Sequence, residues 1–158
     1  MRVSLYVTYD LGYGIGLNGA LPWVLAPSVM ENLTHKTQGK VIVLGRKTWE
    51  TYGWRLGKKT LVMSKTHGKL DGATVCTKID QAMQFGQGRY PELVVVGGNQ
   101  IYQAFFPYVT TIHVAHLMKR HECDTCFPQY WGSDWERTHH VQSMEESMAV
   151  NFSTFVKG

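Results

Sequence analysis

Three short segments combine glycine, hydroxyl and basic side chains in a pattern that suits phosphate binding. They are Gly97-Gly98, Gly45-Arg46-Lys47-Thr48 and Ser64-Lys65, and each follows a run of apolar residues. Glycines let an anion approach the backbone, and the amides of residues 99–101 would open a helix and point at it. Each segment alone is also typical of an ordinary strand-to-helix turn, and the glycines do not form the G-x-G-x-x-G fingerprint. Together they favour a dinucleotide with an extra phosphate, because cations stand at two separate strand ends.

The elements that would position these segments alternate between strand and helix. Apolar runs predict strands at 3–7, 40–44, 60–63, 73–76, 92–96, 111–117 and 149–156, and apolar spacing predicts helices at 27–38, 79–85 and 99–106. A glycine-rich loop spans 12–23. No helical pattern joins the last two strands, so they should pair antiparallel. The sequence therefore predicts an α/β fold with parallel strands and an antiparallel C-terminal strand. The three segments would then meet at the carboxyl ends of the strands.

Length and composition narrow the class of protein. The chain has 158 residues, which predicts one domain over 1–158. Hydrophobic residues make up 44% and charged residues 18%, a balance typical of soluble globular proteins. The net charge of +4 is spread without a basic block, which favours a small anionic ligand over nucleic acid. No apolar run approaches the ~20 residues of a membrane span, and neither a secretory signal nor a disulfide framework is visible. We therefore expect a cytoplasmic protein that binds a small molecule, with no particular oligomeric state implied.

Four ordered motifs carry a resemblance to a known family. The stretches 15–23 (IGLNGALPW), 45–50 (GRKTWE), 96–102 (VGGNQIY) and 124–128 (DTCFP) resemble dihydrofolate reductases in content, order and spacing. The resemblance covers nearly the whole chain. It implies an eight-stranded, mostly parallel sheet flanked by about four helices, with NADPH as hydride donor and reduction of 7,8-dihydrofolate to tetrahydrofolate as the activity.

The resemblance also implies a set of cofactor-binding residues. The turn at 46–48 would hold a cofactor phosphate, and Ser64 with Lys65 would hold the adenosine ribose and its 2′-phosphate. The glycine pair at 97–98 matches one that carries a cis peptide, and the stretch 15–21 matches a mobile loop over the nicotinamide. The full set is Thr8, Ile15, Gly16, Gly45, Arg46, Lys47, Thr48, Ser64, Lys65, Gly97, Gly98, Asn99, Gln100, Ile101 and Tyr102.

The substrate side departs from the family pattern. The family places a carboxylate on the first helix, and that position falls on Val29 or Ser28; a threonine that braces it falls on Ala115. Burial favours the loss of the carboxylate and the threonine together, because either polar group left alone in the core would lack its hydrogen-bond partner. An arginine that clamps the substrate's carboxylate matches Lys58, for which Arg55 could substitute. The expected substrate-binding residues are Tyr6, Ser28, Val29, Met30, Leu33, Arg55, Lys58 and Ala115.

No residue is an obvious proton donor in place of the missing acid. The candidates are His113, Tyr6 and Glu31. A histidine has a suitable pKa, but His113 and Tyr6 could equally be packed strand residues, and Glu31 should face solvent because it lies roughly 200° around the helix from Val29. The pair Cys123 and Cys126 lacks the further ligands that a metal site needs, so we expect no metal.

Three functions remain open at this point. The chain reduces dihydrofolate with a proton from water or another group. Alternatively, it reduces a different C=N or C=O compound, such as another pterin, a pyrimidine or an imine, with the same cofactor. In the third interpretation it binds a nucleotide without catalysis.

Overall fold

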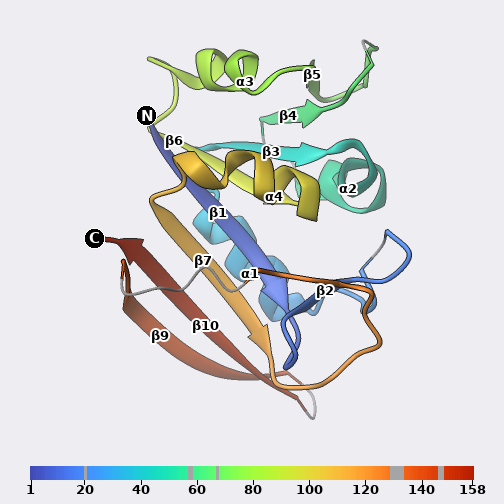
Figure 1. The fold of residues 1–158 in the computed structure, drawn as a ribbon, viewed down its shortest axis with the longest axis vertical. Coiled ribbons are helices and arrows are strands. Elements are labelled where there is room, and N and C mark those ends of the chain that lie inside the picture. The colour runs from blue at the N-terminus through green and yellow to red at the C-terminus, as the bar shows by residue number, and fades with distance from the viewer. Residues whose placement is uncertain (20, 57–58, 67, 129–133, 146–147) are drawn as a thin grey trace.

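A central sheet of eight strands forms the body of the protein in the computed structural model, which describes residues 1–158 except 20, 57–58, 67, 129–133 and 146–147 (Figure 1). The strand order is β5-β4-β3-β6-β1-β7-β10-β9. The bounds are β1 Arg2–Tyr9, β3 Val41–Gly45, β4 Thr60–Met63, β5 Thr74–Cys76, β6 Glu92–Gly97, β7 Thr111–Leu117, β9 Trp135–Glu145 and β10 Met148–Lys157. Strands β1 and β3 to β7 are parallel, and β10 pairs antiparallel with β7. The predicted α/β sheet with an antiparallel C-terminal strand is confirmed.

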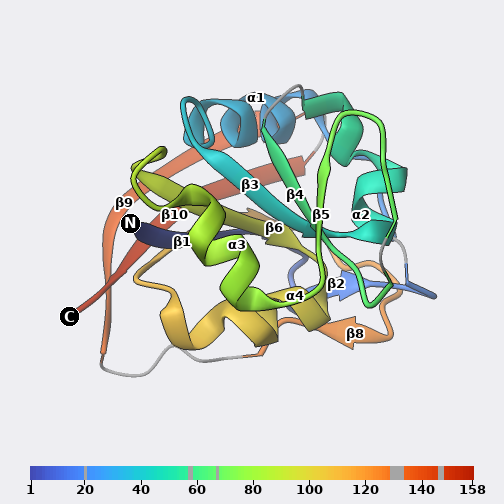
Figure 2. The same cartoon turned by 90° about the horizontal axis from the view of Figure 1, so that it is seen from above.

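Helices cover both faces of this sheet. Helix α1 (Pro27–Lys36) packs on one face, and α3 (Ile79–Gly86) and α4 (Asn99–Phe105) pack on the other (Figure 2). Helix α2 (Arg46–Thr51) follows β3 directly, and short 3₁₀ turns occupy Gly53–Leu56 and Phe106–Tyr108. The first helix ends two residues before the predicted position 38, because the Thr37 hydroxyl donates to the carbonyl oxygen of Leu33 (2.8 Å). None of the described helices is long and apolar enough to cross a membrane.

Strand β1 shows how the two faces receive their cores. Val3, Leu5 and Val7 belong to the core under α3 and α4, whereas Tyr6 belongs to the core under α1. This alternation follows from the two-residue period of a strand. On the α1 side, Leu33 is 2% exposed, and burial of a leucine contributes about 1.5–3 kcal/mol. The register of β1 therefore fixes which side chains can reach helix α1.

A small second sheet replaces part of the predicted glycine loop. Strand β2 (Gly14–Gly16) pairs antiparallel with β8 (Thr125–Cys126). The buried carboxylate of Asp10 accepts hydrogen bonds from the amides of Gly12 (2.9 Å) and Gly14 (2.7 Å), and its other oxygen accepts from the amide of His121 (2.7 Å). The prediction of a loop throughout 12–23 was wrong, because the pairing of β2 depends on a contact with a segment more than 100 residues away.

Strand β9 was also not predicted. It pairs with β10 at the sheet edge, and nearly all of its side chains are at least partly exposed. Its sequence is polar and lacks the apolar alternation that marks a half-buried strand. The C-terminal region therefore supplies two antiparallel strands rather than one.

Candidate active site

A cavity of about 150 Å³ opens at the carboxyl ends of β1 and β6, beside α2 and α4. Its lining comes from segments far apart in the sequence: the ends of β1 and β6, helix α2 with the residue after it, helix α4, the 15–25 stretch, one residue of α1 and one of β8 (Thr125–Cys126). The lining residues are Tyr6, Thr8, Ile15, Gly16, Gly19, Leu21, Leu25, Leu33, Lys47, Thr48, Thr51, Tyr52, Val96, Gly97, Gly98, Asn99, Tyr102 and Thr125. Among these described residues there is one cation and no acid.

The glycine pair forms one wall of the cavity. The Gly97-Gly98 peptide is cis, and Gly97 has φ +151. A side chain at Gly97 would lie 3.6 Å from the Thr48 hydroxyl oxygen and 3.5 Å from the Tyr102 hydroxyl oxygen. Glycine therefore leaves open a space that a side chain would fill. The Tyr102 hydroxyl lies 2.6 Å from the Val96 carbonyl oxygen and 2.8 Å from that of Tyr6, and it donates to this pair.

Helix α4 begins at this wall but offers fewer free amides than expected. The amide of Ile101 donates to the carbonyl oxygen of Gly98 (3.0 Å), so it is engaged within the turn. Of the three residues expected to point an amide at an anion, Asn99 lines the cavity and Gln100 is exposed. The Ile101 side chain packs against Gly45. A Cβ atom on Gly45 would lie 3.3 Å from Cγ1 of Ile101.

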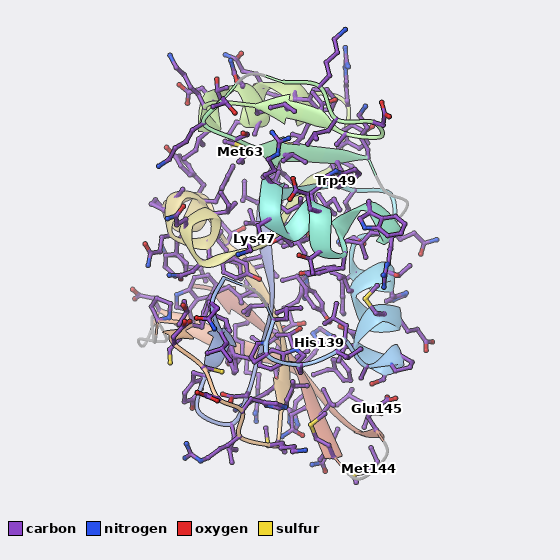
Figure 3. The ribbon with its side chains drawn as sticks, turned by 90° about the vertical axis from the view of Figure 1, so that its right-hand side faces the viewer. Lys47, Trp49, Met63, His139, Met144 and Glu145 are labelled. Atoms are coloured by element: carbon purple, nitrogen blue, oxygen red, sulfur yellow. The ribbon has the colours of Figure 1, made fainter. Side chains whose placement is uncertain are left out.

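The turn at 45–48 places its two cations differently. Lys47, labelled on α2 in Figure 3, lines the cavity. Its Nζ atom donates to the carbonyl oxygen of Asn18 (3.3 Å). Arg46 points to the surface and pairs with Glu50 across one helical turn (3.1 Å). Adjacent residues on a helix point about 100° apart, so only one of the pair can face the cavity.

Ser64 and Lys65 lie at the same edge of the sheet but outside the cavity. They follow β4, whose last residue, Met63, pairs with Gly45 at the end of β3. The Ser64 hydroxyl oxygen is 3.4 Å from the Thr66 hydroxyl oxygen, and Lys65 is exposed. The predicted gathering of all three segments at the carboxyl ends of neighbouring strands is therefore observed.

The stretch over the cavity is held by two carboxylates. Asp10 anchors β2, as described above, and the exposed Asp124 accepts a hydrogen bond from the amide of Asn18 (2.9 Å). Burial would raise the pKa of Asp10, but the amides of Gly14, His121 and Gly12 outweigh it and lower that pKa. Ile15 and Gly16 thereby line the cavity from a segment fixed at both ends.

Tyr6 and Leu33 line the end of the cavity nearest α1. The Tyr6 hydroxyl donates to Oδ1 of Asn32 (2.6 Å), and burial raises its pKa above the usual tyrosine range. Val29 and Ala115, expected beside them, are 1% and 0% exposed and belong to the apolar core under α1. Val29, one of the two positions that the resemblance matches to the family's acid, and Ala115 are therefore apolar and buried.

Other residues expected on the substrate side face a different groove. Ser28, Met30 and Glu31 line an open groove of about 730 Å³ between α1 and the β9–β10 hairpin. Glu31 is exposed, as its position on the helix predicts. The amide of Ser28 donates to the carboxylate of Glu145 (3.3 Å), which Figure 3 labels at the end of β9.

The two candidates for a carboxylate clamp lie after α2. Arg55 is exposed, and its guanidinium stands 5.1 Å from the ring centre of Trp54. It does not line the cavity. Lys58 lies outside the described residues.

His113 lies in a separate cavity of about 370 Å³. Its Nδ1 atom is 3.0 Å from the Thr154 hydroxyl oxygen, and Lys36 and Lys40 line the same space. Burial, and to a lesser extent the charge of Lys36, lowers the pKa of His113 to about 4. Its imidazole is therefore neutral near pH 7.

Cys123 and Cys126 lie at the contact between the β2 and β8 segments. Cys123 lies against Gly14, and its thiol is 3.7 Å from Oδ2 of Asp10. Burial and the Asp10 charge raise the pKa of Cys123 to about 11. No group of three potential ligands that could hold a metal occurs among the described residues.

Several cavity residues were not singled out from the sequence. They include Thr51, Tyr52 and Thr125. The sequence did not mark Tyr52 as a site residue, because a tyrosine just after a helix is usually a packing residue. Thr125 could have been found, since it lies inside the 124–128 motif.

Comparisons with known proteins agree with this architecture. The family model described as dihydrofolate reductase matches residues 2–157. A dihydrofolate reductase of Bacillus subtilis is 29% identical over 146 residues, which cover 91% of this chain and 86% of that protein. A type 3 dihydrofolate reductase of Salmonella typhimurium is 28% identical over 159 residues, which cover 98% and 97%.

A solved structure shares the fold. Dihydrofolate reductase from Enterococcus faecalis, complexed with NADP(H) and RAB-propyl, superposes with a TM-score of 0.88 at 23% identity, covering 99% of this chain and 96% of that one. The match of the family model over nearly the whole chain is decisive. This chain belongs to the dihydrofolate reductase family, a family of NADPH-dependent oxidoreductases.

Proposed function

We propose that this protein uses NADPH to reduce dihydrofolate, slowly, in the cavity at the carboxyl ends of β1 and β6. The observation that supports this most strongly is the cavity's composition. It joins a side-chain-free glycine wall and the Lys47 cation to an apolar end formed by Tyr6 and Leu33. NADPH supplies a hydride when bound. The chain's task is to hold donor and acceptor in contact without water, which supplies much of the rate.

The cofactor would lie along the glycine wall and α2. Phosphate oxygens would meet Lys47, Thr48 and the backbone at Gly97 and Gly98, because these groups offer positive charge and close approach. Tyr102 keeps this wall in place through its hydroxyl. The proposed cofactor residues beyond these are Thr8, Ile15, Gly16, Gly45, Arg46, Ser64, Lys65, Asn99, Gln100 and, as packing against Gly45, Ile101.

The acceptor would lie against Tyr6 and Leu33. Val29 and Ala115 would support this end from the core behind it. Ser28 and Met30 would contact the part of the substrate that extends toward the neighbouring groove, and Arg55 or Lys58 would attract a substrate carboxylate. Because no described lining residue is an acid, the proton would come from water. His113 is proposed as a packing group, since it is neutral and lines a different cavity.

A different C=N or C=O acceptor is the second candidate. The specific observation that favours it is the uncharged end of the cavity, which gives a basic heterocycle nothing to pair with. Both functions use the same cofactor site. NADPH oxidation should therefore be followed by absorbance with dihydrofolate and with a panel of pterins, pyrimidines and cyclic imines. Dihydrofolate giving the highest kcat/KM supports the first function, and a large preference for another compound supports the second.

Binding of NADPH is tested separately by fluorescence titration. Saturable binding is expected for either reductase. Absence of binding would refute both and leave a protein without this cofactor.

The cellular setting is part of the same proposal. We propose that the protein is cytoplasmic, acts on small molecules and does not bind nucleic acid. Its three free cysteines are typical of a reducing compartment, and its charge of +4 is dispersed along the chain. We further propose that 1–158 works as one domain. Strands from both ends of the chain, β1 and β10, flank β7 in one sheet, which supports this.

A further inference from the structure

A cavity of about 370 Å³ lies at the amino ends of the parallel strands, whereas the reaction cavity, the one of about 150 Å³ described above, lies at their carboxyl ends. Arg2, Glu92 and Thr111 line the first of these from the starts of β1, β6 and β7. Helix α1 joins β1 to the parallel strand β3, so it runs back along the sheet and ends at Lys36, which also lines this cavity. The fold therefore gathers side chains from distant parts of the chain around one space.

Positive charge exceeds negative charge in this cavity. Among the described residues that line it, Arg2, Lys36 and Lys40 are cations and Glu92 is the one acid. The buried Glu92 carboxylate pairs with Lys40 (3.1 Å) and Arg2 (3.4 Å). It also accepts a hydrogen bond from the Ser4 hydroxyl (2.7 Å). With the histidines neutral, three cations and one acid leave a formal excess of two positive charges.

Lys36 contributes the part of this charge that no acid neutralises. Among the described residues no carboxylate forms an ion pair with Lys36, which is half-buried and is the last residue of α1. The C-terminal end of a helix carries only about half a negative elementary charge. The helix end therefore offsets a fraction of the excess, and a bound anion would offset the rest.

Hydrogen-bond donors line the same space. Thr111 and Thr154 are each 8% exposed, and β10 brings Thr154 beside His113 on β7, where Nδ1 lies 3.0 Å from the threonine hydroxyl oxygen. Burial and, next, the charge of Lys36 lower the pKa of His113, so the positive field of the cavity reaches this imidazole. Hydroxyl and ammonium groups that face one space from different elements suit an oxyanion with several acceptor oxygens.

We propose that this space, which we name the amino-end cavity, binds a phosphate group, carried by inorganic phosphate or by a small phosphate ester. A phosphate ester carries about 1.5–2 negative charges near pH 7 and three strong acceptor oxygens. It therefore matches an excess of two positive charges and donors on several elements. A carboxylate carries a single charge and would leave part of the excess unbalanced. The inference goes beyond the reductase, because no described residue lines both this cavity and the reaction cavity.

The imidazole of His113 reports directly on binding in the amino-end cavity. Its carbon-bound protons are followed by NMR at one fixed pH and are assigned from the spectrum of His113→Gln. The protein is titrated with sodium phosphate and, separately, with glycerol phosphate, and sodium acetate and sodium chloride at matched ionic strength serve as comparison anions. We expect a saturable shift with the phosphate compounds and only a small linear shift with acetate or chloride. The phosphate compound with the lower dissociation constant identifies the source of the group.

Four variants make the test specific. Lys36→Gln removes one charged donor and should raise the dissociation constant about tenfold or more. Lys36→Arg keeps the charge and should stay within about threefold of the wild-type value. Lys69→Gln removes an exposed lysine between β4 and β5, near the opposite edge of the sheet from β9, and should retain the wild-type value. Lys47→Ala removes the one cation among the described lining residues of the reaction cavity and should also retain it.

A saturable phosphate shift that Lys36→Gln weakens and the other three variants retain supports the proposal. Four results would overturn it: no saturable shift in the wild-type protein, an equal shift with chloride, an unchanged dissociation constant in Lys36→Gln, or an equal loss in Lys36→Arg or Lys69→Gln. A loss in Lys47→Ala would also refute it, because the anion would then lie in the reaction cavity.

Failure of the proposed function has a different signature. Lack of NADPH binding would refute the reductase and leave the His113 titration readable. Circular dichroism establishes that each variant is folded, and the wild-type titration tests for the site without any variant.

Discussion

The hydroxyl of Tyr6 donates a 2.6 Å hydrogen bond to Oδ1 of Asn32, which joins the middle of the sheet to helix α1 at the end of the reaction cavity. Asn32 lies three residues after Val29 and four after Ser28, so it shares a face of the helix with both positions that the resemblance matches to the family's acid. The uncharged pair of Tyr6 and Asn32 therefore lies next to the positions that the resemblance matches to the family's acid. The pair is polar and uncharged, and the phenol hydrogen of Tyr6 is directed at Oδ1 of Asn32.

Lys47 should contribute more to NADPH binding than Arg46. Lys47 lines the cavity, whereas Arg46 pairs with Glu50 at the surface. Loss of one charged hydrogen-bonding partner costs about 1.5–3 kcal/mol, so Lys47→Ala should weaken NADPH binding about tenfold or more. Arg46→Ala should have a smaller effect.

Fluorescence titration at two salt concentrations measures both effects. The exposed Lys157→Ala at the end of β10 controls for the loss of one positive charge. Equal losses in Lys47→Ala and Lys157→Ala would show that only net charge matters.

Gly14 is required by its contact with Cys123. A side chain at Gly14 would overlap Cβ and Sγ of Cys123, whereas one at Gly68 would meet nothing within 4 Å. Overpacking of this kind costs about 1–3 kcal/mol, so Gly14→Ala should lower the free energy of unfolding by that amount. Gly68→Ala should change it by less than about 0.5 kcal/mol. Denaturant unfolding checks this, and two variants of equal stability would be inconsistent with the β2–β8 contact.

Stability should depend on pH through His113. Burial, with the charge of Lys36, lowers its pKa from 6.5 to about 4 in the folded protein, with Lys40, Arg2 and the opposing Glu92 as weaker influences. The unfolded state binds the proton more tightly, so this contribution is complete above about pH 6.5 and is lost as the pH falls toward 4. The loss should be about 2–3 kcal/mol.

The variant His113→Gln isolates this effect. The difference in unfolding free energy between wild type and variant, followed by urea titration from neutral to acidic pH, should change in favour of the variant across that window. A difference that is constant with pH would show that His113 titrates normally.

The cofactor side of the site was largely predictable from the sequence. Val96, Gly97 and Gly98 combine a buried strand with a glycine turn, and both signals are local. The topology then brings Lys47 and Thr48 to the same edge, because parallel strands end together. Which of Arg46 and Lys47 faces the cavity depends on the rotation of a six-residue helix, which the sequence does not determine.

The acceptor side could not be predicted in the same way. Whether Tyr6 fills the end of the cavity depends on the register of β1 and on the rotation of α1, which together bring its hydroxyl to Asn32. Strand β9 was missed because it is polar, and β2 because Gly14 pairs with a distant segment. In each case the deciding contact is long-range.

The rate of hydride transfer as a function of pH tests the central proposal, which is that a dinucleotide site adjoins a pocket whose described lining residues include no acid. Single-turnover oxidation of bound NADPH by saturating dihydrofolate should be followed from about pH 5 to about pH 9. The structure predicts a slow rate that falls steadily as the pH rises, because the proton comes from solvent. A rate that is constant at low pH and then falls through the titration of a single enzyme group would contradict the account and show that an acid serves the pocket.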